Sequence, residues 1–299
     1  NFLAATMRAL GDSKSALYFL MISSVLNIGG DLFFVQVLNW GSNGCALSTV
    51  VSEALCCVLC VLYIRWKVPI LQLGRRWLVF DGKLLRKTVS YGWASAMQQA
   101  TVQLGKIAVQ AIVNTMGVNA MAAFTAASRI DDFAYTPQQN IGHAMTTLMA
   151  QNRGAGKHDR VDAILRYAIG IGLTFGLIVA AAVQFIAPSV VRPFTSDEAV
   201  VLAGASYIRG YIFDCLFAGV QFSFSGYFCA YGKSGLSFLH NTLSILLVRV
   251  PGAYLASKFF PQTLLPMGLA SACGSLFSIL VCVITYHWLK RQQKAVLYG

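Results

Sequence analysis

Long apolar runs follow one another along nearly the whole chain, and they constrain its fold more than any other feature. A helix needs about 20 mostly apolar residues to cross a hydrocarbon core of about 30 Å. Eight such runs predict eight transmembrane helices, at residues 16–38, 42–63, 92–114, 118–147, 165–187, 202–230, 237–257 and 266–288. Only 11% of the 299 residues are charged, against about 25% in a soluble domain. We therefore expect an all-α, polytopic membrane protein, and we exclude a soluble enzyme or nucleic-acid binder.

Lysine and arginine side chains gather in alternate connections between these runs. Of the 23 basic residues, seventeen lie in the connections 8–15, 64–91, 148–166, 231–236 and 288–299. The other connections hold only Arg192 and Lys258. Short cytoplasmic loops of membrane proteins carry such an excess. The first set of connections, and with it the C-terminus, is therefore predicted to be cytoplasmic. The net charge of +12 then reflects membrane topology rather than a nucleic-acid partner.

Two short passages resemble each other and indicate an internal repeat. Residues 8–15 and 229–235 each form a turn around a glycine, Gly11 or Gly232, between two helices. Both turns fall on the same side, which indicates parallel repeats of the kind found in transporters. Counting back from the second repeat, we expect about four helices before this chain, and twelve helices in two six-helix lobes. The chain would then comprise the remainder of the first lobe (1–63), a cytoplasmic inter-lobe linker (64–91), and the second lobe with a cytoplasmic tail (92–299).

Three stretches carry a family resemblance. They are residues 8–14 (RALGDSK), 26–31 (LNIGGD) and 151–157 (QNRGAGK), the last preceded by Pro137 and Gly142. In this order and spacing the chain resembles the multidrug and toxic compound extrusion (MATE) transporters. The resemblance implies helices five to twelve of an antiporter that exchanges Na⁺ or H⁺ for organic, often cationic, compounds in the bacterial inner membrane. It implies small-molecule substrates and a lipid bilayer as partners, no cofactor beyond the coupling ion, no nucleic acid and no obligate protein partner.

Three polar residues in the first two apolar runs are the strongest candidates for a cation site. Asn27 and Asp31 are four residues apart and share one helix face. Thr49 lies on the next helix at a depth similar to that of Asp31. Each is about seven residues from the outer end of its helix, which is roughly 10 Å at a rise of about 1.5 Å per residue. A carboxylate, an amide oxygen and a hydroxyl suit a hard cation such as Na⁺, or a proton relay. The MATE resemblance implies the same three residues. The alternative is a hydrogen-bonded helix contact in which burial keeps Asp31 neutral.

Five further polar side chains within the runs predict a polar track or a substrate cavity. They are Glu53, Gln99, Gln103, Asp131 and Asp214. Ionisable residues inside a membrane are costly and are functional candidates by default, yet a packed helix-end role for Asp214 is equally open. Some MATE relatives carry a carboxylate on the helix where this chain has glutamines, so a cation site in the second lobe also stays open.

Other ionisable residues have structural interpretations. Arg129 and Asp132 are three residues apart and could neutralise each other, with Lys106 on the preceding helix as a second cation. A structural ion cluster or a proton path would account for these charges. His143 and His240 lie near predicted cytoplasmic helix ends and are expected to be solvated.

A flippase for lipid-linked saccharides shares this architecture and is the alternative function. It would need a strongly cationic cavity for a pyrophosphate headgroup. The charges within the runs are instead four basic (Lys106, Arg129, Arg209, Arg249) and five acidic (Asp31, Glu53, Asp131, Asp132, Asp214). This balance favours an organic cation or a neutral substrate. An enzyme would need a nucleophile with its base, or a set of metal ligands. We find neither and expect a transporter.

Overall fold

The computed structural model describes residues 2–69, 71 and 79–298, with side chains as far as Gln292. The chain divides into two compact units, Asn1–Gly82 and Lys83–Gly299, which we call the N-terminal unit and the C-terminal unit and describe separately. Part of the predicted 64–91 linker, including Arg75 and Trp77, lies outside the described residues. The predicted limits of linker and lobes therefore stay predictions.

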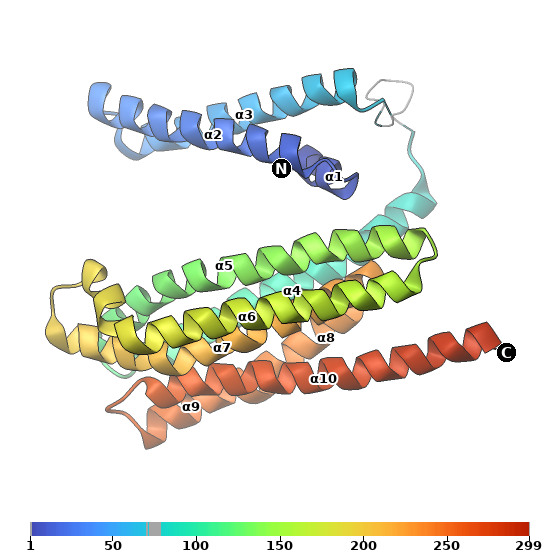
Figure 1. Ribbon diagram of the computed structural model, residues 1–299. Coiled ribbons are helices and arrows are strands. Elements are labelled where there is room, and N and C mark those ends of the chain that lie inside the picture. Colours follow the sequence, from blue (N-terminus) through green and yellow to red (C-terminus); the bar gives the residue numbers. More distant parts are fainter. Residues whose placement is uncertain (1, 70, 72–78, 299) are drawn as a thin grey trace. The chain divides into compact units, whose positions relative to one another are not determined.

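Helices joined by short turns make up the described residues, and no strand occurs among them. The N-terminal unit contains α1 (Phe2–Ala9), α2 (Ser13–Leu32), the π-helical turn η1 (Phe33–Val37) and α3 (Gly41–Lys67). The C-terminal unit contains α4 (Gly82–Asn114), α5 (Val118–Gly154), α6 (His158–Val191), the 3₁₀ turn η3 (Arg192–Phe194), α7 (Glu198–Ala230), α8 (Ser234–Ser244), the π-helical turn η4 (Ile245–Arg249), α9 (Val250–Phe259) and α10 (Leu265–Tyr298). Figure 1 shows these elements within each unit.

Five helical segments are long and apolar enough to cross a membrane, judged by length and composition alone. They are Ser13–Val37, Gly41–Lys67, His158–Phe194, Glu198–Ala230 and Leu265–Gln292. The other three predicted spans, 92–114, 118–147 and 237–257, coincide with α4, α5 and the segment α8–η4–α9. These helices carry more polar side chains, among them the charges at Arg129, Asp131 and Asp132 of α5. The prediction of eight crossing helices is thus supported for five in the described part of the chain.

The turn between α1 and α2 shows how local sequence forms a helix boundary. Gly11 has a φ of +97°, a left-handed conformation that side-chain-bearing residues adopt only with strain. The Asp12 N–H then donates to the Met7 carbonyl at 3.0 Å, as in a Schellman C-cap. The Asp12 carboxylate accepts from the Ser15 N–H at 3.1 Å and from the Tyr63 hydroxyl of α3 at 2.8 Å. These hydrogen bonds favour the charged carboxylate and lower the pKa of Asp12.

Two turns of the C-terminal unit have the same backbone geometry. Gly156 has a φ of +73° and Gly232 a φ of +70°. The lysine after each glycine donates its N–H to the carbonyl five residues earlier, at 2.9 Å for Lys157 and 2.8 Å for Lys233. The similarity between 8–15 and 229–235 in sequence therefore extends to the way each glycine ends one helix and lets the chain turn into the next.

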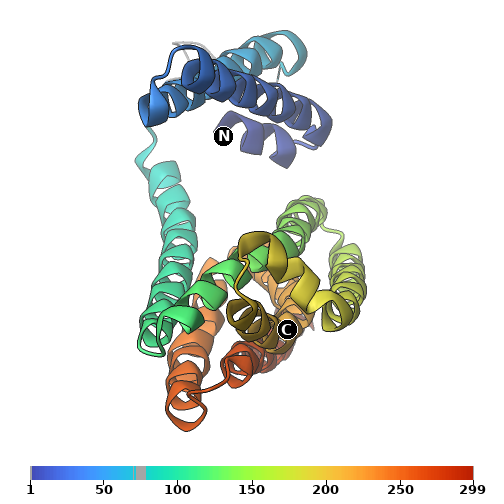
Figure 2. The same cartoon turned by 90° about the vertical axis from the view of Figure 1, so that its left-hand side faces the viewer.

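Helix α7 forms the centre of the C-terminal unit, packed against α5, α6 and α10 (Figures 1 and 2). Glycines let these helices approach closely, as small residues do in membrane bundles. A Cβ on Gly172 of α6 would lie 2.9 Å from Gly219 Cα of α7, and a Cβ on Gly219 would lie 2.6 Å from Gln138 Oε1 of α5. The Gln138 amide donates to the carbonyls of Gly172 and Cys215, at 2.9 and 3.3 Å. This side chain therefore joins all three helices at their crossing.

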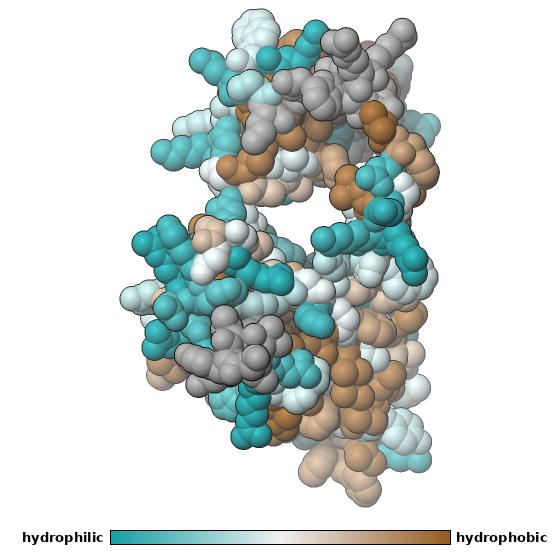
Figure 3. Space-filling model, turned by 90° about the vertical axis from the view of Figure 1, so that its right-hand side faces the viewer, coloured by the Kyte–Doolittle hydropathy of each residue, from teal (hydrophilic) through white to brown (hydrophobic). Residues whose placement is uncertain are grey.

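The flanks of the C-terminal unit are apolar. On α6, the side chains of Leu177, Ile178 and Phe185 are 61%, 63% and 85% exposed. Figure 3 shows hydrophilic side chains gathered at one end of this unit and hydrophobic ones along a flank. Such an apolar surface is suited to contact with lipid chains. Charged side chains inside the bundle are rare by comparison, and they are therefore candidates for a functional role.

Candidate functional site

The structure joins Asn27 of α2 to Thr49 of α3. The Asn27 amide N–H donates to Thr49 Oγ1 at 3.2 Å and to Ser48 Oγ at 3.4 Å. The Ser48 hydroxyl donates in turn to the Asn27 carbonyl at 2.9 Å. Gly30 makes this approach possible, because a Cβ there would overlap the Ser48 side chain. Ser48 belongs to this cluster too and was not predicted from the sequence, although it directly precedes Thr49.

Asp31 lies one turn beyond Asn27 on the same face of α2. Its Oδ1 atom is buried and has no hydrogen-bond partner among the described residues. A buried polar atom without a partner costs about 1–3 kcal/mol, and more for a charged group. The π-helical turn η1 begins two residues after Asp31, and such turns occur frequently at functional sites. Asp31 therefore presents an unpaired carboxylate oxygen near the amide and hydroxyl groups that link α2 to α3.

The five residues predicted to form a polar track are placed in three different settings. Glu53 on α3 and Gln99 on α4 are exposed within their own units. Gln103 and Asp131 line one pocket of the C-terminal unit. Asp214 is fully buried on α7. The structure thus brings together Gln103 and Asp131 and does not join all five.

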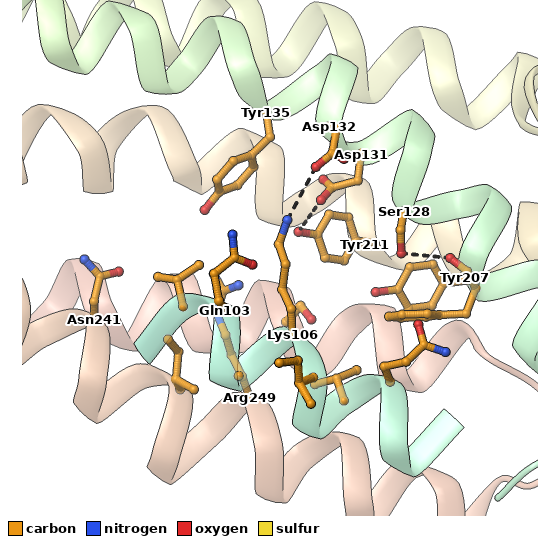
Figure 4. A pocket seen from close by; sticks show the side chains of 18 residues that line it. Gln103, Lys106, Ser128, Asp131, Asp132, Tyr135, Tyr207, Tyr211, Asn241 and Arg249 are labelled. Carbon is orange, nitrogen blue, oxygen red and sulfur yellow. Dashed lines mark hydrogen bonds and ion pairs between the residues drawn. The ribbon is translucent and has the colours of Figure 1, made fainter. Parts of the chain in front are cut away.

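The pocket has a volume of about 520 Å³, within the range of about 300–1,000 Å³ usual for small-molecule sites. Its charged lining residues are Lys106, Asp131, Asp132 and Arg249, and its aromatic ones are Phe124, Tyr135, Tyr207 and Tyr211 (Figure 4). Gly105 brings α4 close to η4, since a Cβ there would lie 2.7 Å from Ile245 Cγ2. Residues of α4, α5, α7 and η4 can therefore meet around one cavity.

Two neighbouring carboxylates of α5 face a single ammonium group in this pocket. Lys106 Nζ lies 3.4 Å from Asp132 Oδ1, and the Tyr211 hydroxyl donates to Asp131 Oδ2 at 3.1 Å. Asp131 Oδ1 is buried without a hydrogen-bond partner in the described part of the chain. The spacing of three residues in sequence had suggested Arg129 as the partner of Asp132. Arg129 instead lines a separate hollow with Phe194, because α5 presents Asp132 toward α4.

Asp214 and Arg249 form a buried ion pair beside the pocket. Their side chains are 2.9 Å apart, and they are 0% and 18% exposed. Arg249 also donates to Ser275 Oγ at 2.6 Å, and Ser275 donates to Gln221 Oε1 at 3.0 Å. The Gln221 amide then donates to the Asn241 side chain. This network joins α7, α8, η4 and α10, and its members Ser275 and Asn241 were not singled out from the sequence.

The expectation that His240 is solvated is wrong. Its side chain is 1% exposed, with Nε2 2.9 Å from Ser225 Oγ of α7 and Nδ1 2.7 Å from Ser278 Oγ of α10. The reason is that α8 presents this face to both neighbouring helices. His143 is exposed within the C-terminal unit, and its solvation stays a prediction.

The helical fold, the apolar flanks and the charges held inside the bundle define a helical membrane protein with an internal pocket. The MatE family model matches residues 94–255, over half of the chain. The chain belongs to the MatE family.

Relatives of known sequence or structure agree with this assignment. The chain is 27% identical to the probable multidrug resistance protein YpnP of Bacillus subtilis, over 96% of this chain and 64% of that protein. It is 20% identical to the probable multidrug resistance protein NorM of Thermotoga maritima, over 98% of this chain and 64% of that protein. A MATE crystal structure in the straight conformation matches with a TM-score of 0.88 and 21% identity, over 98% of this chain and 65% of that one, which shows a shared fold. The chain thus spans about 64% of the length of these curated relatives.

Proposed function

We propose that this chain forms part of a cation-coupled antiporter that exports organic compounds by alternating access, with Na⁺ or H⁺ as the coupling ion. The observation that carries the proposal is the buried Oδ1 atom of Asp31, which has no hydrogen-bond partner among the described residues. It lies one helical turn from Asn27, which is hydrogen-bonded to Thr49. Oxygen ligands of this kind suit a hard monovalent cation, and the carboxylate alone can take up a proton. The names of the relatives support drug export as the outcome.

Coupling requires the cation to bind the two conformations of the transporter with different affinities. Asp31 and Asn27 lie on α2, and Thr49 lies on α3, so a change in the packing of this hairpin would change the distances between the ligands. The π-helical turn η1 begins two residues after Asp31 and offers a position where the helix can change its twist. Cation binding would then favour the arrangement in which the three side chains converge, and its release would favour the other arrangement.

We also propose a cytoplasmic C-terminus in a bacterial inner membrane, and the excess of lysine and arginine in alternate connections supports this orientation. A saccharide-lipid flippase is not favoured. The pocket holds Asp131 and Asp132 as well as Lys106, and Arg249 is paired with Asp214. A pyrophosphate headgroup would therefore meet two carboxylates.

Drug resistance of cells tests the role of Asp31 directly. Asp31→Asn removes the charge and keeps the shape, so it should reduce resistance to that of cells without the transporter, at equal expression in the membrane. Asp197→Asn is the matched control. Asp197 caps α7 by accepting from the Ala199 N–H at 2.9 Å, and Asn is as good a cap as Asp. Full resistance in the Asp31→Asn cells would overturn the proposal.

A further inference from the structure

The exposed side of α6 carries two arginines close to the start of the helix. α6 packs against α5 and α7, and its buried residues recur at the spacing of one helix face. Arg160, Arg166 and Tyr167 are exposed within the C-terminal unit. The segment His158–Phe194 is one of the five that are long and apolar enough to cross a membrane. The three side chains therefore lie on the outer side of a candidate spanning helix, near one of its ends.

The spacing of these residues allows both arginines to reach one depth. Arg160 and Tyr167 are seven residues apart and lie on the same stripe of the helix. Arg166 lies six residues beyond Arg160, which is about 9 Å along the axis. Side chains of a helix tilt toward its N-terminus, so Arg166 is directed back toward Arg160. Arginine can lay its stem along an apolar surface and keep its guanidinium group in the polar layer. Two guanidinium groups can therefore flank Tyr167 at the level of lipid headgroups.

These two arginines have no counter-ion on the protein. Neither takes part in an ion pair within the described part of the chain. Asp162 of α6 faces α10 instead, where it accepts from the Tyr286 hydroxyl at 3.2 Å and pairs with Lys290. The remaining charges of residues 157–166 are three basic side chains and one acid, a net charge of +2, from Lys157, Arg160, Arg166 and Asp159. A charged side chain beside hydrocarbon is costly without a partner, so this end of α6 favours an anion.

The exposed side of α6 is apolar beyond the arginines. Tyr167 is 72% exposed, and Leu177, Ile178 and Phe185 are exposed further along the helix. Gly170 has open space around it, so an acyl chain can approach the helix backbone there. Tyrosine is enriched where a membrane meets water. This surface, which we call the α6 strip (Arg160, Arg166, Tyr167, Leu177, Ile178 and Phe185), thus has a basic end, an interfacial ring and an apolar continuation.

We propose that the α6 strip binds a phospholipid with an anionic headgroup, and that Arg160 and Arg166 select it over a zwitterionic one. A guanidinium group matches phosphate oxygens with two parallel hydrogen bonds. Phosphatidylglycerol presents its phosphate charge alone, whereas phosphatidylethanolamine adds an ammonium group that the arginines repel. In the orientation proposed above, the start of α6 faces the cytoplasmic leaflet, where basic clusters bind anionic lipids. The inference depends neither on the coupling ion nor on the exported compound.

Native mass spectrometry of the full-length protein in detergent tests the proposal. Phosphatidylglycerol and phosphatidylethanolamine with identical acyl chains are titrated separately, and the affinity for the first bound lipid is measured. Each basic side chain near the headgroup favours an anionic lipid by about fivefold. Wild type should therefore prefer phosphatidylglycerol by about tenfold or more. The double variant Arg160→Gln with Arg166→Gln should bind the two lipids with equal affinity.

Two further variants separate local charge from total charge and from hydrogen-bond geometry. Arg192→Gln with Lys258→Gln removes two exposed cations from connections predicted to face the other side of the membrane, and it should keep the wild-type preference. Arg160→Lys with Arg166→Lys keeps the charge and loses the planar fork, so its preference should lie between those of wild type and the glutamine variant.

Free glycerol phosphate tests whether the acyl chains matter. It shares the charged group of phosphatidylglycerol and has no chains to lie along Tyr167 and Leu177. At millimolar concentration it should leave lipid binding unchanged. Displacement of phosphatidylglycerol by glycerol phosphate would show a simple anion site and would overturn the assignment to a lipid.

The glutamine variant decides the role of the arginines. Both side chains are exposed, so this variant should fold and unfold at the wild-type temperature. A wild-type preference for phosphatidylglycerol in this variant overturns the inference, as does equal affinity of wild type for the two lipids. Neither measurement uses an ion gradient. Failure here together with drug resistance that still depends on Asp31 therefore leaves the proposed function standing.

Discussion

The ion pair between Asp214 and Arg249 should tolerate the loss of both charges better than the loss of one. The charged atoms are 2.9 Å apart, and Asp214 is 0% exposed. Two unit charges about 4 Å apart attract by ~4 kcal/mol at an effective dielectric constant of about 20. Arg249→Met leaves the carboxylate buried and unpaired, which should lower the free energy of unfolding by about 3–5 kcal/mol. Adding Asp214→Asn removes the stranded charge, and the double variant should then cost only about 1–2 kcal/mol for the hydrogen bonds lost.

Thermal unfolding of the purified protein in detergent measures this difference. A unit of this size shifts its unfolding temperature by about 2–4 °C per kcal/mol. Arg249→Met should therefore unfold on the order of 10 °C below wild type, and the double variant should recover more than half of that loss. Asp197→Asn, which removes an exposed carboxylate, is the control and should unfold with wild type. The reasoning is refuted if Arg249→Met is as stable as wild type, or if the double variant is no more stable than Arg249→Met.

Paired glycine substitutions give two further predictions, each checked by the same unfolding measurement. Gly172→Ala should cost about 1–3 kcal/mol, because its Cβ would lie 2.9 Å from Gly219 Cα. Gly170→Ala, with no atom within 4 Å, should stabilise α6 by up to about 1 kcal/mol, and equal effects would contradict the close crossing. Gly156→Ala should cost about 1 kcal/mol because of its φ of +73°. Gly154→Ala lies in helical conformation with open space around it and should cost nothing, so an equal loss in both would count against the turn geometry.

Helix positions and the tight turns could be predicted from the sequence because both depend on local residues. Apolar length predicts where a helix runs, and Gly11 and Gly232 end helices through their own backbone freedom. The contact between Asn27 and Thr49 could also be predicted from the sequence. The two helices form a hairpin, so the depth of each residue can be counted from the same turn.

Contacts between helices distant in sequence could not be predicted in this way. Periodicity shows which residues share a face of one helix, but not which faces of two helices meet. Asp132 therefore appeared able to pair with Arg129 on its own helix, whereas the structure pairs it with Lys106 of α4. The ion pair of Arg249 with Asp214 is even harder to predict from the sequence, because Arg249 is the last residue of the π-helical turn η4. Such a turn shifts every following side chain around the helix, and no 3.6-residue pattern predicts it.

Buried polar residues were the second source of error. His240 is close to the start of the predicted span 237–257, which suggested a solvated position, yet α8 packs against both α7 and α10 and His240 is buried. The two serines that are hydrogen-bonded to the His240 ring, Ser225 and Ser278, are small residues that are common in membrane helices. They give no sequence signal until the helices are placed side by side.

The central claim is that Asn27, Asp31 and Thr49 couple cation movement to export. It is tested most directly by dye efflux from vesicles that contain the full-length protein. A Na⁺ gradient and a pH gradient would be imposed in turn on wild type and on Asp31→Asn. Coupling at the cluster of Asn27, Asp31 and Thr49 predicts that one of the two gradients drives efflux by wild type and that neither drives it in the variant. Efflux by Asp31→Asn at the wild-type rate, or no efflux by folded wild type with either gradient, would contradict the account.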